Sequence, residues 1–281
     1  NKVIKKEKPN IIFHLAAQSI VSVGYKEPLE TFKTNLIGSV NILESSRVNK
    51  IRNLVYITSD KCYLNDGRSK KYTEKDILGG DDPYSASKAG AEIIFHSYLK
   101  SFFINNKKIR FASGRAGNVI GGGDMKKDGI IPDIVRSIKH NKELVIRNPK
   151  SIRPWQHVLE AISGYLVLGH LLIKNKLSKS HYPSWNFGPK SLKSKNVIFL
   201  FKEFIKFWGI KKTTRFLKSK KFMESKILIL DSKKAIKELN WRPRLSLKES
   251  LSLTVEWYKK YFLKKDLEKL TISQIKYYLN K

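Results

Sequence analysis

Short apolar runs alternate with segments of helical periodicity over the first 117 residues. Residues 11–17, 54–58 and 109–114 are largely apolar, as buried parallel strands are. Residues 29–49 lie between the first two runs and carry apolar side chains at helical spacing. The side chains at this spacing are Phe32, Leu36, Val40 and Leu43. This alternation predicts an α/β domain with a parallel sheet.

The second apolar run is followed by a polar loop and a clear helix start. Residues 65–80 are rich in Asn, Asp, Gly and Lys, which is typical of a loop. Asp82 and Pro83 match an N-cap followed by proline at the first helical position. We expect the helix that they begin to continue to about Phe103.

After Asn118 the pattern becomes less regular. Residues 121–124 read Gly-Gly-Gly-Asp and predict a loop, whereas helices are expected at 130–140, 158–173 and 247–261. We therefore expect the α/β domain to end near residue 117. A smaller mixed α/β region should follow it.

Composition and charge exclude some classes of protein. With 41% hydrophobic and 28% charged residues among 281, the chain is typical of a folded globular protein. The net charge of +32 comes mostly from lysine spread over the whole length. Because arginine is sparse, this favours compositional drift over a nucleic-acid footprint. The chain has one cysteine and no visible signal peptide, which predicts a cytoplasmic protein. Because no apolar stretch is long enough for a membrane helix, we expect no membrane partner.

Tyr84 and Lys88 are candidates for acid–base chemistry. Four residues apart, they share one face of the predicted helix. An unperturbed phenol has a pKa of ~10, and a nearby ammonium favours its ionised form. Taken alone the pair is weak, since a helix rich in Tyr and Lys produces it by chance.

A second polar group ends the preceding strand. The run at 54–58 ends in Thr58-Ser59-Asp60-Lys61, and ligands of open α/β sheets bind where parallel strands end. Ser59 can bond a hydroxyl, Asp60 can donate a proton, and Lys61 can act beside an acidified C–H. An ordinary polar strand exit explains Ser59 and Asp60, but not the Tyr–Lys pair that follows.

Six motifs in one order resemble those of extended short-chain dehydrogenase/reductases that act on nucleotide sugars, the NAD-dependent epimerase/dehydratase family. They are His14-Leu15-Ala16-Ala17-Gln18, Asn35-Leu36-Ile37-Gly38-Ser39, Thr58-Ser59-Asp60-Lys61-Cys62-Tyr63, Pro83-Tyr84-Ser85-Ala86-Ser87-Lys88, residues 115–124 and Arg153-Pro154-Trp155-Gln156-His157-Val158. Within the family, Ser-Asp-Lys before Cys-Tyr resembles the CDP-glucose 4,6-dehydratases. At the positions of Ser59-Asp60-Lys61, the dTDP-glucose enzymes carry Thr-Asp-Glu. The epimerases carry a Ser or Thr without the acidic pair.

The resemblance implies a fold and a set of site residues. Residues 1–117 would form a partial NAD-binding Rossmann-like domain, and 118–281 mainly a substrate-binding region with some segments returning to the sheet. The implied catalytic residues are Ser59, Asp60, Lys61, Tyr84 and Lys88. The residues implied to bind the cofactor are Ala16, Ala17, Gln18, Asn35, Thr58, Tyr84 and Lys88. The residues implied to bind the substrate are Ser59, Asn118, Gly122 and Arg153.

The resemblance also implies the reaction, dehydration of CDP-glucose to its 4-keto-6-deoxy form for surface polysaccharides. Tyr84 would deprotonate the 4-hydroxyl as NAD oxidises C4. Lys61 stands where related enzymes place the base for C5, and Asp60 would protonate the departing C6 oxygen before hydride returns to C6. A homodimer is implied through the helices at 29–49 and 83–103.

Several alternatives stay open. The chain could be another nucleotide-sugar 4,6-dehydratase, a 4-epimerase, or a catalytically inactive basic binding protein. Arg153 could be a surface turn residue, and residues 121–123 a plain flexible loop. His14, Trp155, Trp185 and Trp241 fit packed aromatic positions better than ligand sites, and no grouping has metal-ligand spacing.

The family begins with a strand, a G-x-x-G-x-x-G turn and a helix that holds the cofactor pyrophosphate. No such motif precedes His14. We therefore expect the N-terminal strands of the sheet to be missing, and the chain as it stands to bind NAD weakly.

Overall fold

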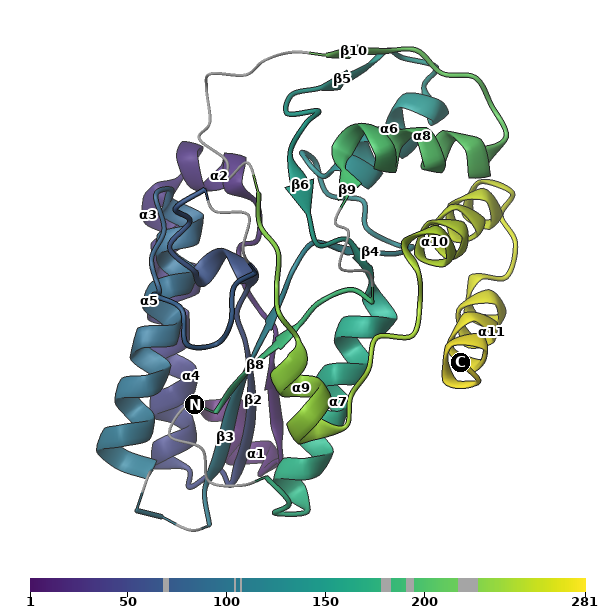
Figure 1. Cartoon of the computed structure of the whole chain (residues 1–281). Coiled ribbons are helices and arrows are strands. Elements are labelled where there is room, and N and C mark those ends of the chain that lie inside the picture. Colours follow the sequence, from purple (N-terminus) through teal and green to yellow (C-terminus); the bar gives the residue numbers. More distant parts are fainter. Residues whose placement is uncertain (68–70, 104, 107, 178–182, 191–194, 217–226) are drawn as a thin grey trace. The chain divides into compact units, whose positions relative to one another are not determined.

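A computed structural model of the chain is drawn in Figure 1. It describes all residues except 68–70, 104, 107, 178–182, 191–194 and 217–226. The chain divides into two compact units, each built from three segments. Unit 1 contains residues 1–116, 163–187 and 230–241, and unit 2 contains residues 117–162, 188–229 and 242–281.

Unit 1 is built on a four-stranded parallel sheet of order β1-β2-β3-β8 (Figure 1). The strands are β1 (Ile12–His14), β2 (Asn53–Ile57), β3 (Arg110–Ala116) and β8 (Ser184–Phe187). The first three match the apolar runs of the sequence, and nearly every residue of the inner strands β2 and β3 is buried. The predicted α/β class with a parallel sheet is therefore confirmed.

Unit 1 has one helix before β1, one after β8, and the others between successive strands of the sheet. They are α1 (Lys2–Glu7), α2 (Val21–Lys26), α3 (Pro28–Phe32), the π-helix η1 (Lys33–Ile37), α4 (Gly38–Val48), the 3-10 helix η2 (Asp60–Cys62), α5 (Pro83–Tyr98), the π-helix η3 (Leu99–Phe103) and α9 (Lys233–Leu239). The helix α7 (Val158–Ile173) begins in unit 2 and continues in unit 1 from residue 163. The predicted helix over 29–49 is thus interrupted by a π-turn.

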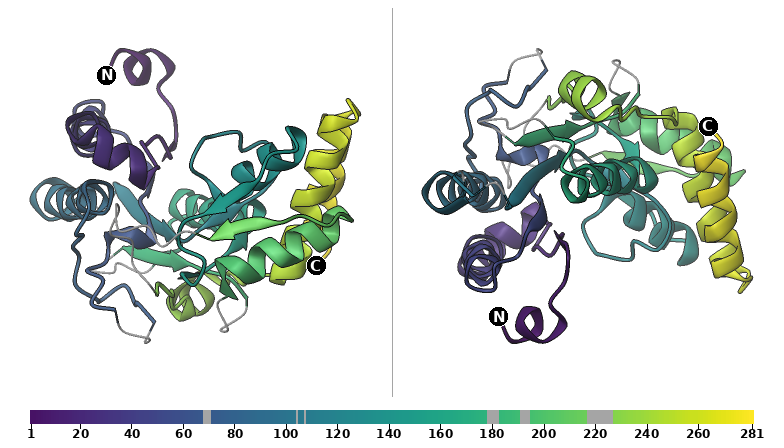
Figure 2. Two further views of the ribbon diagram at one scale, coloured as in Figure 1. Left: turned by 90° about the horizontal axis from the view of Figure 1, so that it is seen from above. Right: turned by 90° about the horizontal axis from the view of Figure 1, so that it is seen from below.

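Both faces of the sheet are covered by helices (Figure 2). Leu43 of α4 and Phe95 of α5 are fully buried in one cluster with Leu54 of β2. On α7, a Cβ added at Gly164 would lie 2.4 Å from Phe187 of β8, so only glycine lets this helix approach the sheet so closely. The sheet is therefore the middle layer of unit 1, as parallel sheets require.

Unit 2 combines three short strand pairs with helices. The pairs are β4 (Val119–Ile120) with β7 (Gln156–His157), β5 (Leu144–Ile146) with β10 (Thr214–Phe216), and β6 (Ile152–Arg153) with β9 (Lys195–Asn196). Its helices are α6 (Ile130–Lys139), α8 (Val197–Trp208), α10 (Leu247–Phe262), α11 (Leu267–Leu279) and the first turn of α7.

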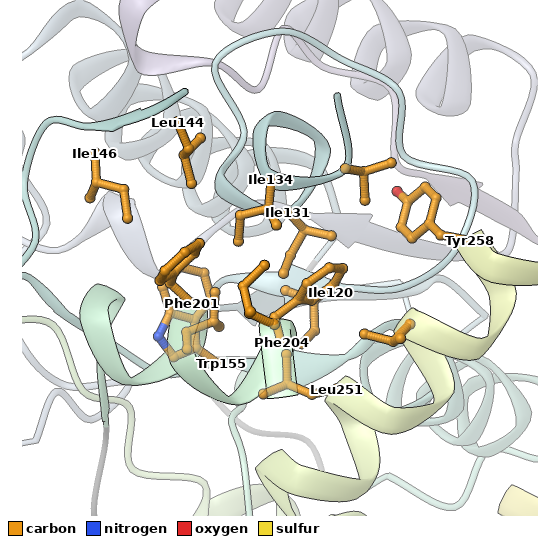
Figure 3. Packing of buried hydrophobic residues seen from close by; sticks show 14 residues of the cluster. Ile120, Ile131, Ile134, Leu144, Ile146, Trp155, Phe201, Phe204, Leu251 and Tyr258 are labelled. Carbon is orange, nitrogen blue, oxygen red and sulfur yellow. The ribbon is translucent and has the colours of Figure 1, made fainter. Parts of the chain in front are cut away.

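The core of unit 2 lies between α6, α8 and α10 (Figure 3). Ile134, Phe204 and Leu251 contribute one fully buried side chain from each helix. Local signals fix the helix ends: Asn196 caps α8, and Ser246 with Glu249 forms a capping box at α10. Trp155, Trp185 and Trp241 are buried, as the sequence predicted.

No helix in the described part of the chain is both long and apolar enough to cross a membrane. No group of three or more His, Cys, Asp or Glu side chains in the same part of the chain is arranged to hold a metal ion.

Candidate active site

The expected catalytic residues lie in unit 1, where β2 ends and α5 begins. Ser59 is the N-cap of η2, and its Oγ accepts a hydrogen bond of 3.2 Å from the backbone N–H of Lys61. Asp82 caps α5 and accepts a hydrogen bond of 3.0 Å from Ser85 N, which places Tyr84 in the first helical turn. Because α5 packs against η2, the two sequence motifs meet.

Ser59, Asp60 and Tyr84 form one buried hydrogen-bonded cluster. The Ser59 hydroxyl donates to Asp60 Oδ1 at 2.9 Å, and the Tyr84 side chain is hydrogen-bonded to that of Ser59. All three residues are at most 7% exposed. The serine therefore connects a phenol to a carboxylate, two groups that can carry protons in opposite directions.

Burial raises the pKa of the Tyr84 phenol well above its ordinary value. The nearby carboxylates of Asp60 and Asp82 raise it further, while the Ser59 hydrogen bond offsets part of the effect. The phenol is protonated at neutral pH in this state. Its ionisation during a reaction requires additional positive charge close by.

Lys88 lies one turn after Tyr84 and is 6% exposed. Burial lowers the pKa of its ammonium to about 8, although the Glu92 carboxylate acts in the opposite direction. Even so, the ammonium remains mostly protonated at pH 7. Its charge is thus available on the same helix face as Tyr84.

A fully buried ion pair lies behind these residues and was not found from the sequence. Arg115 of β3 donates to both carboxylate oxygens of Glu92, from Nε at 3.0 Å and from Nη2 at 2.8 Å. Glu92 also accepts hydrogen bonds from the hydroxyls of Thr58 and Ser113. The sequence did contain a signal for Glu92, because Tyr84, Lys88 and Glu92 are spaced four residues apart and therefore share one face of α5.

Asn35 fixes the loop after β1 to the helix that carries Tyr84. Its Oδ1 accepts from Gln18 N at 2.8 Å, and its Nδ2 donates to Gln18 O and to Ser87 Oγ, each at 2.9 Å. Asn35 lies within the π-turn η1, a feature that is frequent at functional sites. The structure thus brings Gln18 and Asn35 together as residues that position the loop, with Ala16 and Ala17 just before them.

These residues fit the nicotinamide cofactor that the resemblance implies. The loop of Ala16 and Ala17 follows the end of β1, Thr58 follows the end of the adjacent β2, and ligands bind where such strands end. The alanines leave room for a ligand beside the loop, and the buried Lys88 ammonium suits hydroxyl oxygens. Ala16, Ala17, Thr58 and Lys88 would hold the cofactor.

Three of the four expected substrate-binding residues, Asn118, Gly122 and Arg153, belong to unit 2, whereas Ser59 belongs to unit 1. Asn118 precedes β4, and its carbonyl oxygen accepts a hydrogen bond of 3.1 Å from Gln156 N. Arg153 is 4% exposed within β6, so it is not the surface turn residue that the sequence also allowed.

Gly122 is part of a supported loop rather than a plain flexible one. A Cβ at this position would lie 2.1 Å from Trp257 Cγ, so any other residue would collide with that indole. The next residue in α10, Tyr258, donates from its hydroxyl to Asp124 O at 2.6 Å. Both aromatic residues therefore hold the glycine-rich loop in place.

Comparisons with known proteins agree with this arrangement. The chain is 42% identical to the CDP-glucose 4,6-dehydratase of Salmonella typhimurium over 269 residues, which covers 94% of this chain and 74% of that protein. It is 24% identical to the dTDP-D-glucose 4,6-dehydratase of Bos taurus, over 92% of this chain and 70% of that protein.

Solved structures share the fold. The dTDP-glucose 4,6-dehydratase of Bacillus anthracis in complex with NAD matches with a TM-score of 0.76 at 25% identity, over 92% of this chain and 75% of that one. The UDP-glucose 4-epimerase of Thermotoga maritima matches with a TM-score of 0.80 at 24% identity, over 93% of this chain and 81% of that one.

The family model described as "NAD dependent epimerase/dehydratase family" matches residues 1–179, which is more than half of the chain. That match includes the Ser59–Asp60–Tyr84 cluster, Lys88 and the loop fixed by Asn35. The chain therefore belongs to the NAD-dependent epimerase/dehydratase family.

Proposed function

We propose that the chain is a nucleotide-sugar 4,6-dehydratase, a hydro-lyase, and that its substrate is CDP-glucose. The observation that carries the proposal is the buried cluster in which Ser59 connects the Asp60 carboxyl to the Tyr84 phenol. The identity of 42% with a CDP-glucose 4,6-dehydratase supports the choice of nucleotide. The product would be CDP-4-keto-6-deoxyglucose, an intermediate for surface-polysaccharide deoxysugars made in the cytoplasm.

Oxidation at C4 needs a base for the 4-hydroxyl proton. Tyr84 is placed for this role, with its hydroxyl held by Ser59 in a buried site. Because burial raises the pKa of this phenol, the Lys88 ammonium and the cationic nicotinamide together must favour the phenolate. Bound NAD supplies the hydride acceptor for C4 and the hydride that C6 later receives.

Elimination of water needs an acid at the C6 oxygen and a base at C5. Asp60 is the candidate acid, since it is 3% exposed and close enough to Tyr84 to raise that phenol's pKa. The 4-ketone acidifies the C5 proton, and Lys61 is the candidate group to accept it or to stabilise the resulting enolate. Ser59 orients both the phenol and the carboxyl.

Asp60→Asn tests the assignment. The amide keeps the size of the side chain but cannot donate a carboxylic proton, so we expect C4 oxidation to persist and water loss to stop. The assay is incubation with NAD and CDP-, dTDP-, UDP- or GDP-glucose, followed by the alkaline ultraviolet absorbance of 4-keto-6-deoxy sugars. Asp81→Asn, at an exposed position before the α5 cap, is the matched control.

Two outcomes would contradict the proposal. Full-rate dehydration by Asp60→Asn would remove Asp60 from the role of acid. A C4 epimer as the product of the unmodified chain would replace the dehydratase with an epimerase. A 4-keto-6-deoxy product from a nucleotide other than CDP would correct the substrate alone.

We also propose a homodimer through α4 and α5. Ile37, before α4, and Ile93 of α5 are 51% and 57% exposed, and large exposed apolar side chains mark association surfaces. Ile93→Asp should give a monomer in light scattering, whereas Ile77→Asp, in the loop before α5, should leave the dimer intact. A monomeric unmodified chain would refute the dimer.

A further inference from the structure

Two buried polar atoms lie on one face of the strand pair β4–β7. Among the described residues, Asn118 Oδ1 and His157 Nε2 have no hydrogen-bond partner. Ile120 is the register partner of His157, and paired residues direct their side chains to the same face. Asn118 precedes Ile120 by two positions, so the alternation of side chains places it on that face as well.

The His157 ring is a neutral donor in this environment. Its Nδ1 accepts a hydrogen bond of 3.3 Å from Leu159 N, so the proton lies on Nε2. Burial lowers the pKa of the ring to about 4, which keeps it uncharged at pH 7. The imidazole is 2% exposed, and its Nε2 lies 3.9 Å from the point where a Cβ of Gly121 would be.

A donor and an acceptor are therefore directed to the same face of the strand pair, which borders the glycine-rich loop at Gly121. Unpaired buried polar atoms cost stability, and functional sites are where such costs persist. A hydroxyl group satisfies both atoms, because it accepts from Nε2–H and donates to Asn118 Oδ1. An ionised phosphate oxygen can only accept, so it satisfies one of the two.

We propose that His157 is a substrate-binding residue that, together with Asn118, holds one hydroxyl group of the nucleotide sugar. The inference rests on the proposed function and adds a residue to its substrate site. The loop beside His157 is held by Trp257, which lies against Gly122, and by the hydrogen bond from Tyr258 to Asp124.

His157→Asn is the sharpest test. The Asn Oδ1 can take the place of Nδ1 as acceptor for Leu159 N–H, while the Nε2 donor is lost. Asn118→Ala removes the other partner independently, so the test does not depend on one variant folding. Ser46→Ala is the control, because Ser46 Oγ, on α4 of unit 1, is another buried atom with no hydrogen-bond partner in the described part of the chain.

Affinity is measured by isothermal titration calorimetry with CDP-glucose, CDP and 2′,3′-dideoxy-CDP, which has no ribose hydroxyl, and thermal unfolding is recorded for each variant. Loss of one hydrogen bond should weaken CDP-glucose binding about tenfold in His157→Asn and Asn118→Ala, but not in Ser46→Ala. If CDP binding is unchanged, the hydroxyl belongs to the sugar. If CDP binding weakens and 2′,3′-dideoxy-CDP binding does not, the hydroxyl belongs to the ribose.

Equal weakening of all three ligands would overturn the hydroxyl assignment. Affinities within twofold of the unmodified chain, in both variants, would show that His157 and Asn118 do not bind the ligand. An unmodified chain that binds none of the CDP-, dTDP-, UDP- and GDP-sugars would instead contradict the proposed function, and the inference with it.

Discussion

The buried ammonium of Lys88 should make the folded chain less stable than it would be without the charge. At 6% exposure the side chain has lost most of its hydration, and burial lowers its pKa from 10.5 to about 8. We predict that Lys88→Met, which keeps the length of the side chain and removes the charge, increases the free energy of unfolding at pH 7. The same change should abolish dehydration.

The magnitude and its pH dependence follow from the two pKa values. One pKa unit corresponds to ~1.4 kcal/mol, so the difference between 10.5 and about 8 makes the charge cost about 3 kcal/mol at pH 7. Between pH 8 and 10.5 the unfolded chain binds more protons at this lysine than the folded chain does. The stability of the unmodified chain therefore rises with pH in this window relative to the variant.

The assay is urea unfolding of both proteins from pH 7 to pH 10. The variant should be more stable by about 3 kcal/mol at pH 7, and its advantage should shrink as the pH rises above 8. Lys108→Met, at an exposed loop position, should change stability by less than about 0.5 kcal/mol at every pH. A destabilised Lys88→Met at pH 7, or a stability difference that does not vary with pH, would refute the reasoning.

Three further changes test other contacts. Glu92→Gln leaves Arg115 as an unpaired buried charge and should cost roughly 3–5 kcal/mol in urea unfolding; a loss below about 1 kcal/mol would contradict a strong pair. Gly122→Ala should lower the melting temperature by its contact with the Trp257 indole, and it should lower it less in a Trp257→Ala background, where the indole is gone and the contact of 2.7 Å with Cβ remains. Glu249 has its pKa lowered to about 2, mainly by Lys281, so its stabilisation is present above its ordinary pKa near 4.5 and lost as the pH falls toward 2. Because the Lys281 and Glu249 side chains are 37% and 30% exposed, solvent screens the pair, and Glu249→Gln should cost less than ~1 kcal/mol at pH 7 and nothing near pH 2.

The parts of the fold that were predictable carry local signals. The strands β2 and β3 are apolar runs, and α5 begins at the Asp82-Pro83 cap that the sequence announces. The π-helix η1 was missed because the sequence of residues 33–37 carries no local signal for it, whereas Asn35 within it bonds the distant backbone of Gln18. The strand β8 was missed because four residues, two of them polar, give no recognisable pattern without β3 beside them.

The site was predictable to a similar degree. Residue types and order identified Ser59, Asp60 and Tyr84, and the structure places them in one hydrogen-bonded cluster. The pairing of Glu92 with Arg115 could not be derived, since it joins residues of two elements that meet only in the folded sheet. The direction in which burial shifts the pKa of Tyr84 likewise requires knowledge of its surroundings.

The strand β8 also constrains how the protein folds as it is synthesised. Its hydrogen bond from Ser113 to Ser184 joins residues 71 apart, and the last segment of unit 1 begins only at residue 230. While the ribosome makes the intervening residues, the β8 side of β3 has no strand to pair with, and such edges attract other chains. A nascent chain arrested before residue 184 should therefore be more prone to aggregation than one released after residue 241.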